Sequence, residues 1–416
     1  MTGAPAIPAA SAQRRALLAV FSSTFFVRFA FGITTAVFAS YITRSTAGIG
    51  QGEAGVVGIV SAMAPAGELA TVLLSGALAD RYGRFPVLFS GIGASAVIFA
   101  LKSTTRAPVA LGGLNLLFGV ASGAILAASL GLIGDWSGAD ERGLEMGRFD
   151  AMNLSGWVGG FAFGFAALGL VDNATLWFVF VVGAGVLTVG LFSARRLIRG
   201  LPVHAAGSSY VFREVLRQVF RRSVLLVTLP WLVIYMLIGT ALIFLGSAAN
   251  GVGVSTELLA GIIAIGGLLL VLTQPYFGRL SDRWGRNRLM TSGAIGFVSL
   301  MVFASLVVAF GARVELLVGL GASVLPALAY GPAALAALAD LSVEISRATT
   351  MAIYSLLISA GMVLGLVSST GLFALFGNPG LYVFFGSIAG ALVLLTVARY
   401  RDPGLRAGGA LRTPAR

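Results

Sequence analysis

Long apolar segments, separated by short polar ones, follow one another along almost the whole chain. About twelve of them run for close to twenty residues with few interior charges, which is the length that a helix needs to cross a hydrocarbon core of about 30 Å. The pattern therefore predicts an all-α membrane protein with twelve transmembrane helices. The expected spans are 16–41, 54–78, 86–104, 108–132, 147–170, 174–194, 223–247, 256–279, 289–311, 315–338, 349–375 and 379–398.

Composition favours the same class. Of the 416 residues, 57% are hydrophobic and only 11% are charged, whereas an average soluble domain has about 25% charged residues. The first span is too long for a signal peptide and contains Arg28, so we expect it to remain as the first helix. The chain has no cysteine, which excludes disulfides and thiolate metal sites. We expect no cofactor and no bound metal.

The net charge of +12 is distributed unevenly between the loops. If the N-terminus is cytoplasmic, only Arg44, Lys102, Arg106 and Arg313 fall in loops on the outer side, and the other loop arginines are cytoplasmic. The positive-inside rule then predicts a protein of the cell (inner) membrane with both termini in the cytoplasm. Nucleic-acid binding needs a contiguous basic patch with exposed aromatics, which such short loops do not offer.

Two loops carry the same motif, 202 residues apart: GALADRYGR after the second span and GRLSDRWGR after the eighth. The residues that recur are Gly76, Asp80, Arg81, Gly83 and Arg84 in the first loop, and Gly278, Asp282, Arg283, Gly285 and Arg286 in the second. A second block, with Asp135, Arg142, Met146, Gly156 and Gly160, recurs 205 residues later as Asp340, Arg347, Met351, Gly361 and Gly365. Gly32 and Gly239 align the first and seventh spans. We therefore predict two homologous six-helix halves.

The expected boundaries follow from the repeat and from the polar segments. We assign 1–194 and 223–400 to the two bundles, 195–222 to an arginine-rich cytoplasmic connector, and 401–416 to a cytoplasmic tail.

On these duplicated loops the chain resembles the major facilitator superfamily, over about residues 14 to 400. The resemblance implies two bundles related by an axis along the membrane normal, with a central site opened alternately to each side. It implies a transporter of a small molecule and no enzyme, and we expect a monomer. The sequence departs from the family pattern in two places. Asn115 stands where many proton-driven members have an arginine, and the fifth helix lacks the Gly-Pro of drug antiporters.

The motif aspartates need partners from elsewhere in the chain. Asp80 lies at the partly negative C-terminal end of the second helix, which does not stabilise a carboxylate. Arg347, at the start of the eleventh helix, is a candidate partner for it, as Arg142 is for Asp282, and such contacts can close the cytoplasmic side. In the alternative interpretation, arginines such as Arg84 and Arg286 anchor the loops at lipid head groups, and the glycines permit a tight turn.

Arg28 and Glu68 are predicted to lie deep in the membrane. Each stands about twelve residues from the cytoplasmic end of its helix, or roughly 17 Å at 1.5 Å per residue, so the two side chains are at the right depth to pair. Charges at that depth usually face the protein interior or a water-filled cavity. Three interpretations remain open: a structural salt bridge, a proton-coupling site at Glu68, and an anchor for an anionic substrate at Arg28.

Helices 1, 4, 7 and 10 line the cavity in the resembling fold. Asn115, Ser122 and Ser129 recur every seven residues and so share one face of helix 4. The candidate substrate and coupling residues are Arg28, Glu68, Asn115, Ser122, Trp231, Tyr235 and Tyr330. For the small polar residues, helix packing is the alternative. Asp150, Asn153 and Trp157 form a further stripe on helix 5. Because Asp150 is close to the cytoplasmic side, we favour a gate or an interface for this stripe, with a central site as the alternative.

The sequence thus favours a proton-coupled secondary transporter of a small organic molecule. We expect export, since Arg28-Phe-Ala-Phe-Gly32 resembles the first helix of many efflux members. The alternative is an uptake transporter that binds an organic anion through Arg28. A membrane enzyme, channel or sensor is a third possibility, but neither a catalytic cluster nor an appended soluble domain supports it.

Overall fold

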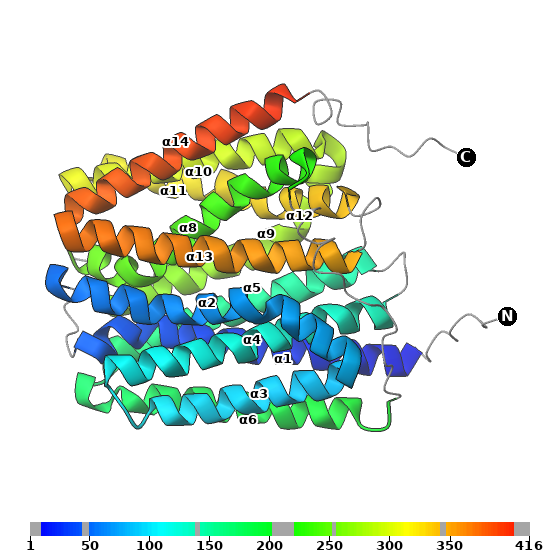
Figure 1. Cartoon of the computed structure of the whole chain (residues 1–416). Coiled ribbons are helices and arrows are strands. Elements are labelled where there is room, and N and C mark those ends of the chain that lie inside the picture. The colour runs from blue at the N-terminus through cyan, green and yellow to red at the C-terminus, as the bar shows by residue number, and fades with distance from the viewer. Residues whose placement is uncertain are drawn as a thin grey trace.

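The computed structural model describes residues 10–43, 50–137, 142–201, 220–251, 255–341 and 347–402. Within these ranges the regular elements are helices, most of them long and running side by side (Figure 1). The first half contains α1 (Ala10–Thr43), α2 (Gln51–Tyr82), α3 (Arg84–Lys102), α4 (Pro108–Trp136), α5 (Arg142–Leu170), the short 3-10 helix η1 (Asn173–Thr175) and α6 (Trp177–Ile198). The second half contains α8 (Arg222–Gly251), α9 (Thr256–Trp284), α10 (Arg286–Phe310), α11 (Val314–Leu328), α12 (Tyr330–Leu341), α13 (Arg347–Phe376) and α14 (Asn378–Arg401).

Twelve stretches of the described residues are long and apolar enough to cross a membrane. The tenth of them is made by α11 and α12 together, interrupted at Ala329 just after Pro326. α1 begins and α14 ends at the same end of the molecule (Figure 1). The prediction of an all-α membrane protein with twelve transmembrane helices in two bundles is therefore confirmed.

Equivalent helices pack in equivalent ways in the two halves. α1 packs on α5 and α3 on α6 in the first half, and α8 packs on α13 and α10 on α14 in the second. The halves meet through α2 against α13 and α5 against α9. In Figure 1, α13 accordingly lies beside α2.

The repeated glycines set the closest of these contacts. A Cβ added to Gly156 would lie 2.5 Å from the carbonyl oxygen of Phe25, so α5 can approach α1 only without a side chain there. Its repeat partner Gly361 meets Leu232 of α8 in the same manner, at 2.6 Å. Close approach of helix backbones at small residues is the usual basis of helix packing in membranes. The repeat in the sequence therefore encodes one helix contact, used twice.

Two glycines of the loop motifs make the turns. Gly83 has φ 93° and separates α2 from α3, and Gly285 has φ 91° and separates α9 from α10. Such positive values are strained for any residue with a side chain. Two helices can therefore follow each other with one residue between them.

The two halves are in contact at the end where α2 begins, which we call the Gln51 end. Val57 of α2, Phe244 of α8 and Phe373 of α13 belong to one buried apolar cluster there, and the two phenylalanine rings lie 4.7 Å apart. Gln51 also donates a hydrogen bond to the carbonyl of Ala374 in α13, 3.1 Å away. The opposite end, where Gly83 turns the chain, is called the Gly83 end.

Candidate functional site

Two opposite charges lie at the centre of the first half. Arg28 of α1 and Glu68 of α2 are 5% and 4% exposed, and Arg28 Nη1 donates to Glu68 Oε2 over 3.5 Å. Arg28 Nε also donates to Asn153 Oδ1 of α5 at 2.7 Å. The arginine is thus held between an anion and a neutral amide. The structure brings Arg28 and Glu68 together, whereas their role in transport stays a prediction.

Glu68 has partners in both halves of the protein. Ser122 of α4 donates to Oε2 at 2.8 Å, and Ser359 of α13 donates to Oε1 at 3.2 Å. Ser359 belongs to the second half, and its hydroxyl is buried. Hydrogen bonds to a charged acceptor are stronger than neutral ones. The carboxylate therefore joins the two halves at the middle of the membrane-spanning region.

Glycines make this geometry possible. Gly119 of α4 lies against the carbonyl oxygen of Ala64, and Gly67 of α2 lies against that of Leu116. With no side chains at either position, α2 and α4 approach closely enough for the short Ser122 hydroxyl to reach the carboxylate. On the other side of Arg28, a Cβ at Gly156 would lie 2.9 Å from the arginine Cβ. Glycines at these helix contacts therefore leave the space that Arg28 and Glu68 occupy.

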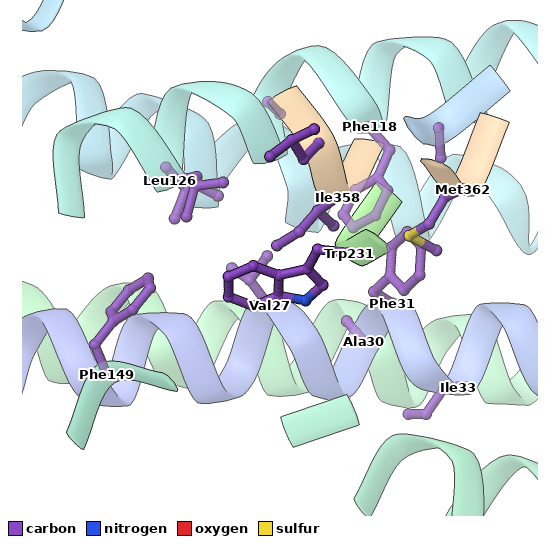
Figure 2. Close-up of a cluster of buried hydrophobic side chains, with 14 of the residues drawn as sticks. Val27, Ala30, Phe31, Ile33, Phe118, Leu126, Phe149, Trp231, Ile358 and Met362 are labelled. Carbon is purple, nitrogen blue, oxygen red and sulfur yellow. The ribbon is translucent and has the colours of Figure 1, made fainter. Parts of the chain in front are cut away.

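Aromatic side chains stack on one another in both halves. Phe31 of α1 stacks on Trp157 with centroids 5.2 Å apart, and Trp231 of α8 stacks on Tyr235 at 6.3 Å. Figure 2 shows Trp231 gathered with Phe31 and Phe118 of the first half and with side chains of α13. Trp231 is 5% exposed. Trp231, a predicted site residue of α8, therefore packs among side chains of both halves.

Asn115 lies nearer to the Gln51 end than Glu68. Its Nδ2 donates to the carbonyl of Val60 at 2.9 Å, and the residue is 2% exposed. It lines a small cavity of about 20 Å³ together with residues of α1, α2 and α13. Asn115 therefore does not contact the Arg28–Glu68 pair, although Ser122 on the same face of α4 does.

The comparison with protein families identifies the chain. The profile of the Major Facilitator Superfamily matches residues 20–329 and 235–414. The chain belongs to the major facilitator superfamily. It is thus a multi-pass membrane transporter, as the loop motifs indicate. No curated protein matches the sequence.

Solved structures of this superfamily share the fold. The human organic anion transporter MFSD10 (TETRAN) is 15% identical, with a TM-score of 0.63 over 92% of this chain and 99% of that one. A mutant of the nucleoside transporter NupG is also 15% identical, with a TM-score of 0.66 over 96% of this chain and 100% of that one. Identity this low shows a common architecture and leaves the substrate open.

Two candidate residues of this superfamily member lie away from the central pair. Tyr330 begins α12 inside the second half, 1% exposed, and its hydroxyl donates to the carbonyl of Val227 at 3.5 Å. Its ring meets Phe297 edge-on, with centroids 6.4 Å apart. Ser129 is fully buried in the first half. The structure brings neither residue to Glu68.

The two loop motifs make local contacts at the Gly83 end. Arg84 pairs with Asp135 of α4 and donates to the carbonyl of Gly131. Arg286 pairs with Asp282 one turn away in the same loop. The side chains of Asp80, Arg142 and Arg347 lie outside the described part of the structure, so the predicted gating contacts remain predictions. Arg81 and Arg283 are exposed.

Lys102 differs most from its sequence-based placement. It was expected in an outer loop, but it ends α3 with no exposed surface, and Nζ lies 4.6 Å and 4.7 Å from the ring centroids of Phe99 and Phe118. Among the described residues, Nζ has no hydrogen-bond partner. Even the last residue of α3 is buried in the bundle. From the sequence, a charged residue at the end of an apolar span is expected in a loop instead.

The sequence reasoning also missed Ser359. It is a single hydroxyl in a long apolar span, and the one signal available was Ser355, four residues earlier on the same helix face. Asn153 was noticed as part of the polar stripe on helix 5, for which a gate or an interface was favoured over a central site, but it was not connected with Arg28. Within the described residues, no group of three or more His, Cys, Asp or Glu side chains comes together to hold a metal.

Proposed function

We propose that this protein is a proton-coupled secondary transporter of a small organic molecule, working by alternating access, with Glu68 as the proton-binding group. The observation that carries the proposal is the position of this carboxylate. It is 4% exposed and accepts hydrogen bonds from Arg28 and Ser122 of one half and from Ser359 of the other. Buried acids of membrane helices commonly belong to proton pathways.

Proton binding at this position has a direct mechanical consequence. The ionised carboxylate holds Arg28 electrostatically and accepts charge-assisted bonds from both serines. When the acid is neutral, these bonds weaken and the link to α13 loosens. The change in charge thereby favours separation of the two halves. A conformational change needs this kind of differential interaction with its ligand.

Of the two substrate hypotheses, the observed contacts favour the proton-coupled one. Arg28 is already held by Glu68 and Asn153, so an anionic substrate would have to displace a partner to reach it. Uptake of an organic anion through Arg28 remains the second candidate. It is supported by the structural similarity to MFSD10, which is an organic anion transporter. The efflux direction rests on the first-helix motif that contains Arg28.

The topology and the gate are further parts of the proposal. We place the Gly83 end in the cytoplasm of the cell membrane, with both termini on that side and the protein acting as a monomer, because the arginine-rich loops gather there. The aspartates of the repeated loops, Asp80 and Asp282, are proposed to hold this end closed through Arg347 and Arg142. The bundle limits 1–194 and 223–400 belong to the same proposal.

The test needs a substrate first. Thermal-shift screening of the purified protein against organic anions, nucleosides and organic cations identifies a ligand, because specific binding stabilises the folded state. The best ligand is then used in proteoliposomes, with and without an imposed pH gradient. We expect the wild-type protein to accumulate it only with the gradient.

Glu68→Gln should abolish this accumulation and retain binding and exchange, because glutamine resembles the protonated acid in shape. The matched control is Glu53→Gln, an exposed acid at the start of the same helix. Gradient-driven accumulation by Glu68→Gln at the wild-type level would show that Glu68 is only a structural partner of Arg28.

A further inference from the structure

The cavity at Asn115 lies between the two halves of the protein. Its walls come from α1, α2 and α4 on one side and from Met362 and Leu366 of α13 on the other. The volume of about 20 Å³ exceeds the roughly 10–15 Å³ that one water molecule requires. An apolar cavity of this size would be empty, so the polarity of its lining decides whether it is occupied.

Two hydrogen-bond acceptors in the lining lack their usual donors. Asn115 Oδ1 is buried without a partner among the described residues, and its orientation is fixed because Nδ2 already donates to Val60. Pro65 lies inside α2 and has no N–H, so the carbonyl of Ser61, four residues earlier, loses its ordinary helical bond. Ser61, Pro65 and Asn115 all line the cavity.

Hydroxyl groups complete the lining. Thr34 and Thr35 of α1 donate to the carbonyls of Ala30 and Phe31 in their own helix, so their oxygens remain able to accept. The few polar groups of the lining are therefore mainly acceptors, and the rest of the wall is apolar. A ligand that fits it must donate hydrogen bonds and be no larger than one water molecule.

From this lining we infer that a single water molecule is bound in the cavity and donates to Asn115 Oδ1 and to the Ser61 carbonyl. The bond it makes to Asn115 supplies a donor to this buried acceptor, which is unfavourable to leave without one. Ser61 and Glu68 are seven residues apart on α2, so the water lies about 10 Å from the carboxylate, toward the Gln51 end. Because α13 supplies one wall, separation of the halves at that end would open this position to the medium.

The inference does not depend on proton coupling, and radiolytic footprinting tests it directly. X-ray irradiation converts water, including ordered water, into hydroxyl radicals that oxidise neighbouring methionines. Met362 lines the cavity and is 2% exposed, whereas Met290 and Met301 are each 1% exposed and are not among its lining residues. We expect Met362 to be oxidised at least five times faster than these two internal controls.

Two variants remove the water in different ways. Asn115→Leu replaces the acceptor by an apolar side chain of similar size, and Pro65→Ala returns an N–H to the Ser61 carbonyl. Each should bring the Met362 rate down to that of Met290 and Met301. Ser129→Ala, which removes a buried hydroxyl from the same helix but not from the cavity, should leave it unchanged.

Two results would overturn the inference. If wild-type Met362 is oxidised no faster than the two control methionines, the cavity is dry, and this comparison needs no variant to fold. The second comparison uses the wild-type protein in sodium chloride and in N-methylglucamine chloride at equal ionic strength. Faster oxidation of Met362 after removal of sodium would show that a sodium ion, and not water, occupies the site.

Discussion

The Ser359 hydroxyl of the second half donates a hydrogen bond to the Glu68 carboxylate of the first, over 3.2 Å. Both residues are almost fully buried, at 1% and 4% exposure. Among the contacts at the centre of the protein, this one joins an ionisable group directly to the opposite bundle. It therefore couples the charge of Glu68 to the relative position of the halves.

Removing this bond should make the Gln51 end easier to open. Ser359→Ala deletes one buried hydrogen bond of about 1 kcal/mol, which corresponds to a change of about fivefold in a conformational equilibrium. Spin labels at Val109 and Val314 report the opening, because both positions are exposed and begin α4 and α11 at that end. We expect the longer-distance population in double electron-electron resonance to rise about fivefold.

Ser369→Ala is the matched control for this measurement. Ser369 is also on α13 and fully buried, but its hydroxyl donates to the carbonyl of Gly365 in its own helix. A distance distribution that is the same for both variants would mean that the Ser359 bond does not hold the halves together.

The Arg28–Glu68 pair should show strong coupling in a double-mutant cycle. Arg28→Gln alone leaves Glu68 as a buried anion without its cation, and we expect a loss of about 3–5 kcal/mol in the free energy of unfolding. Glu68→Gln alone should be comparably costly. The double variant should be more stable than either single variant, since no uncompensated charge remains.

Thermal unfolding in one detergent measures all four proteins of this cycle. If the stability losses of the two single variants add up to that of the double variant within about 0.5 kcal/mol, the two residues are energetically independent and do not form a stabilising ion pair.

Much of the fold was predictable because the sequence features that determine it, the apolar spans and the packing glycines, occur repeatedly along the chain. Twelve spans are visible because each must be about as long as the membrane is thick. The equivalence of Gly156 and Gly361 was visible because the same close helix contact was needed twice. The depth of Arg28 and Glu68 followed from counting residues, since the rise of a helix is constant.

The contacts of Ser359 and Lys102 could not be predicted, because they depend on which face of each helix is turned toward its neighbours. Ser359 reaches Glu68 only because α13 packs on α2, and an isolated serine in an apolar span looks like any packing residue. Lys102 is buried because the last turn of α3 faces inward. Its charge at the end of the span suggested a loop, but in the structure its Nζ lies over the rings of Phe99 and Phe118.

The paired glycines should tolerate no side chain. Gly160 lies against the carbonyl of Phe29, and its repeat partner Gly365 lies against that of Met236. Valine at either position would force α1 and α5, or α8 and α13, apart, and we expect loss of the monodisperse folded protein in size-exclusion chromatography. Gly185→Val is the control, because no atom lies within 4 Å of a Cβ placed there. Normal folding of Gly160→Val would show that the packing of α5 on α1 does not need a glycine at this position.

The proposed topology can be tested cleanly because the chain has no cysteine. Asp172→Cys, between α5 and α6, should react with a membrane-impermeant maleimide in intact cells. Ser208→Cys, in the segment between α6 and α8, should react only after permeabilisation. Labelling of Ser208→Cys in intact cells would place both termini outside.

The last prediction concerns Lys102, and it asks whether the buried charge of this residue stabilises or destabilises the folded protein. A buried ammonium without hydrogen bonds loses several kcal/mol of hydration. The two phenylalanine faces near Nζ return about 2 kcal/mol each at best. Lys102→Met keeps the length of the side chain and removes the charge, so we expect an increase in thermal stability. Arg106→Met is the contrast, because Arg106 donates hydrogen bonds to Asn173 and its loss should destabilise the protein. If Lys102→Met instead lowers the melting temperature as much as Arg106→Met does, the ammonium is held by a bonded partner, and its burial serves the fold.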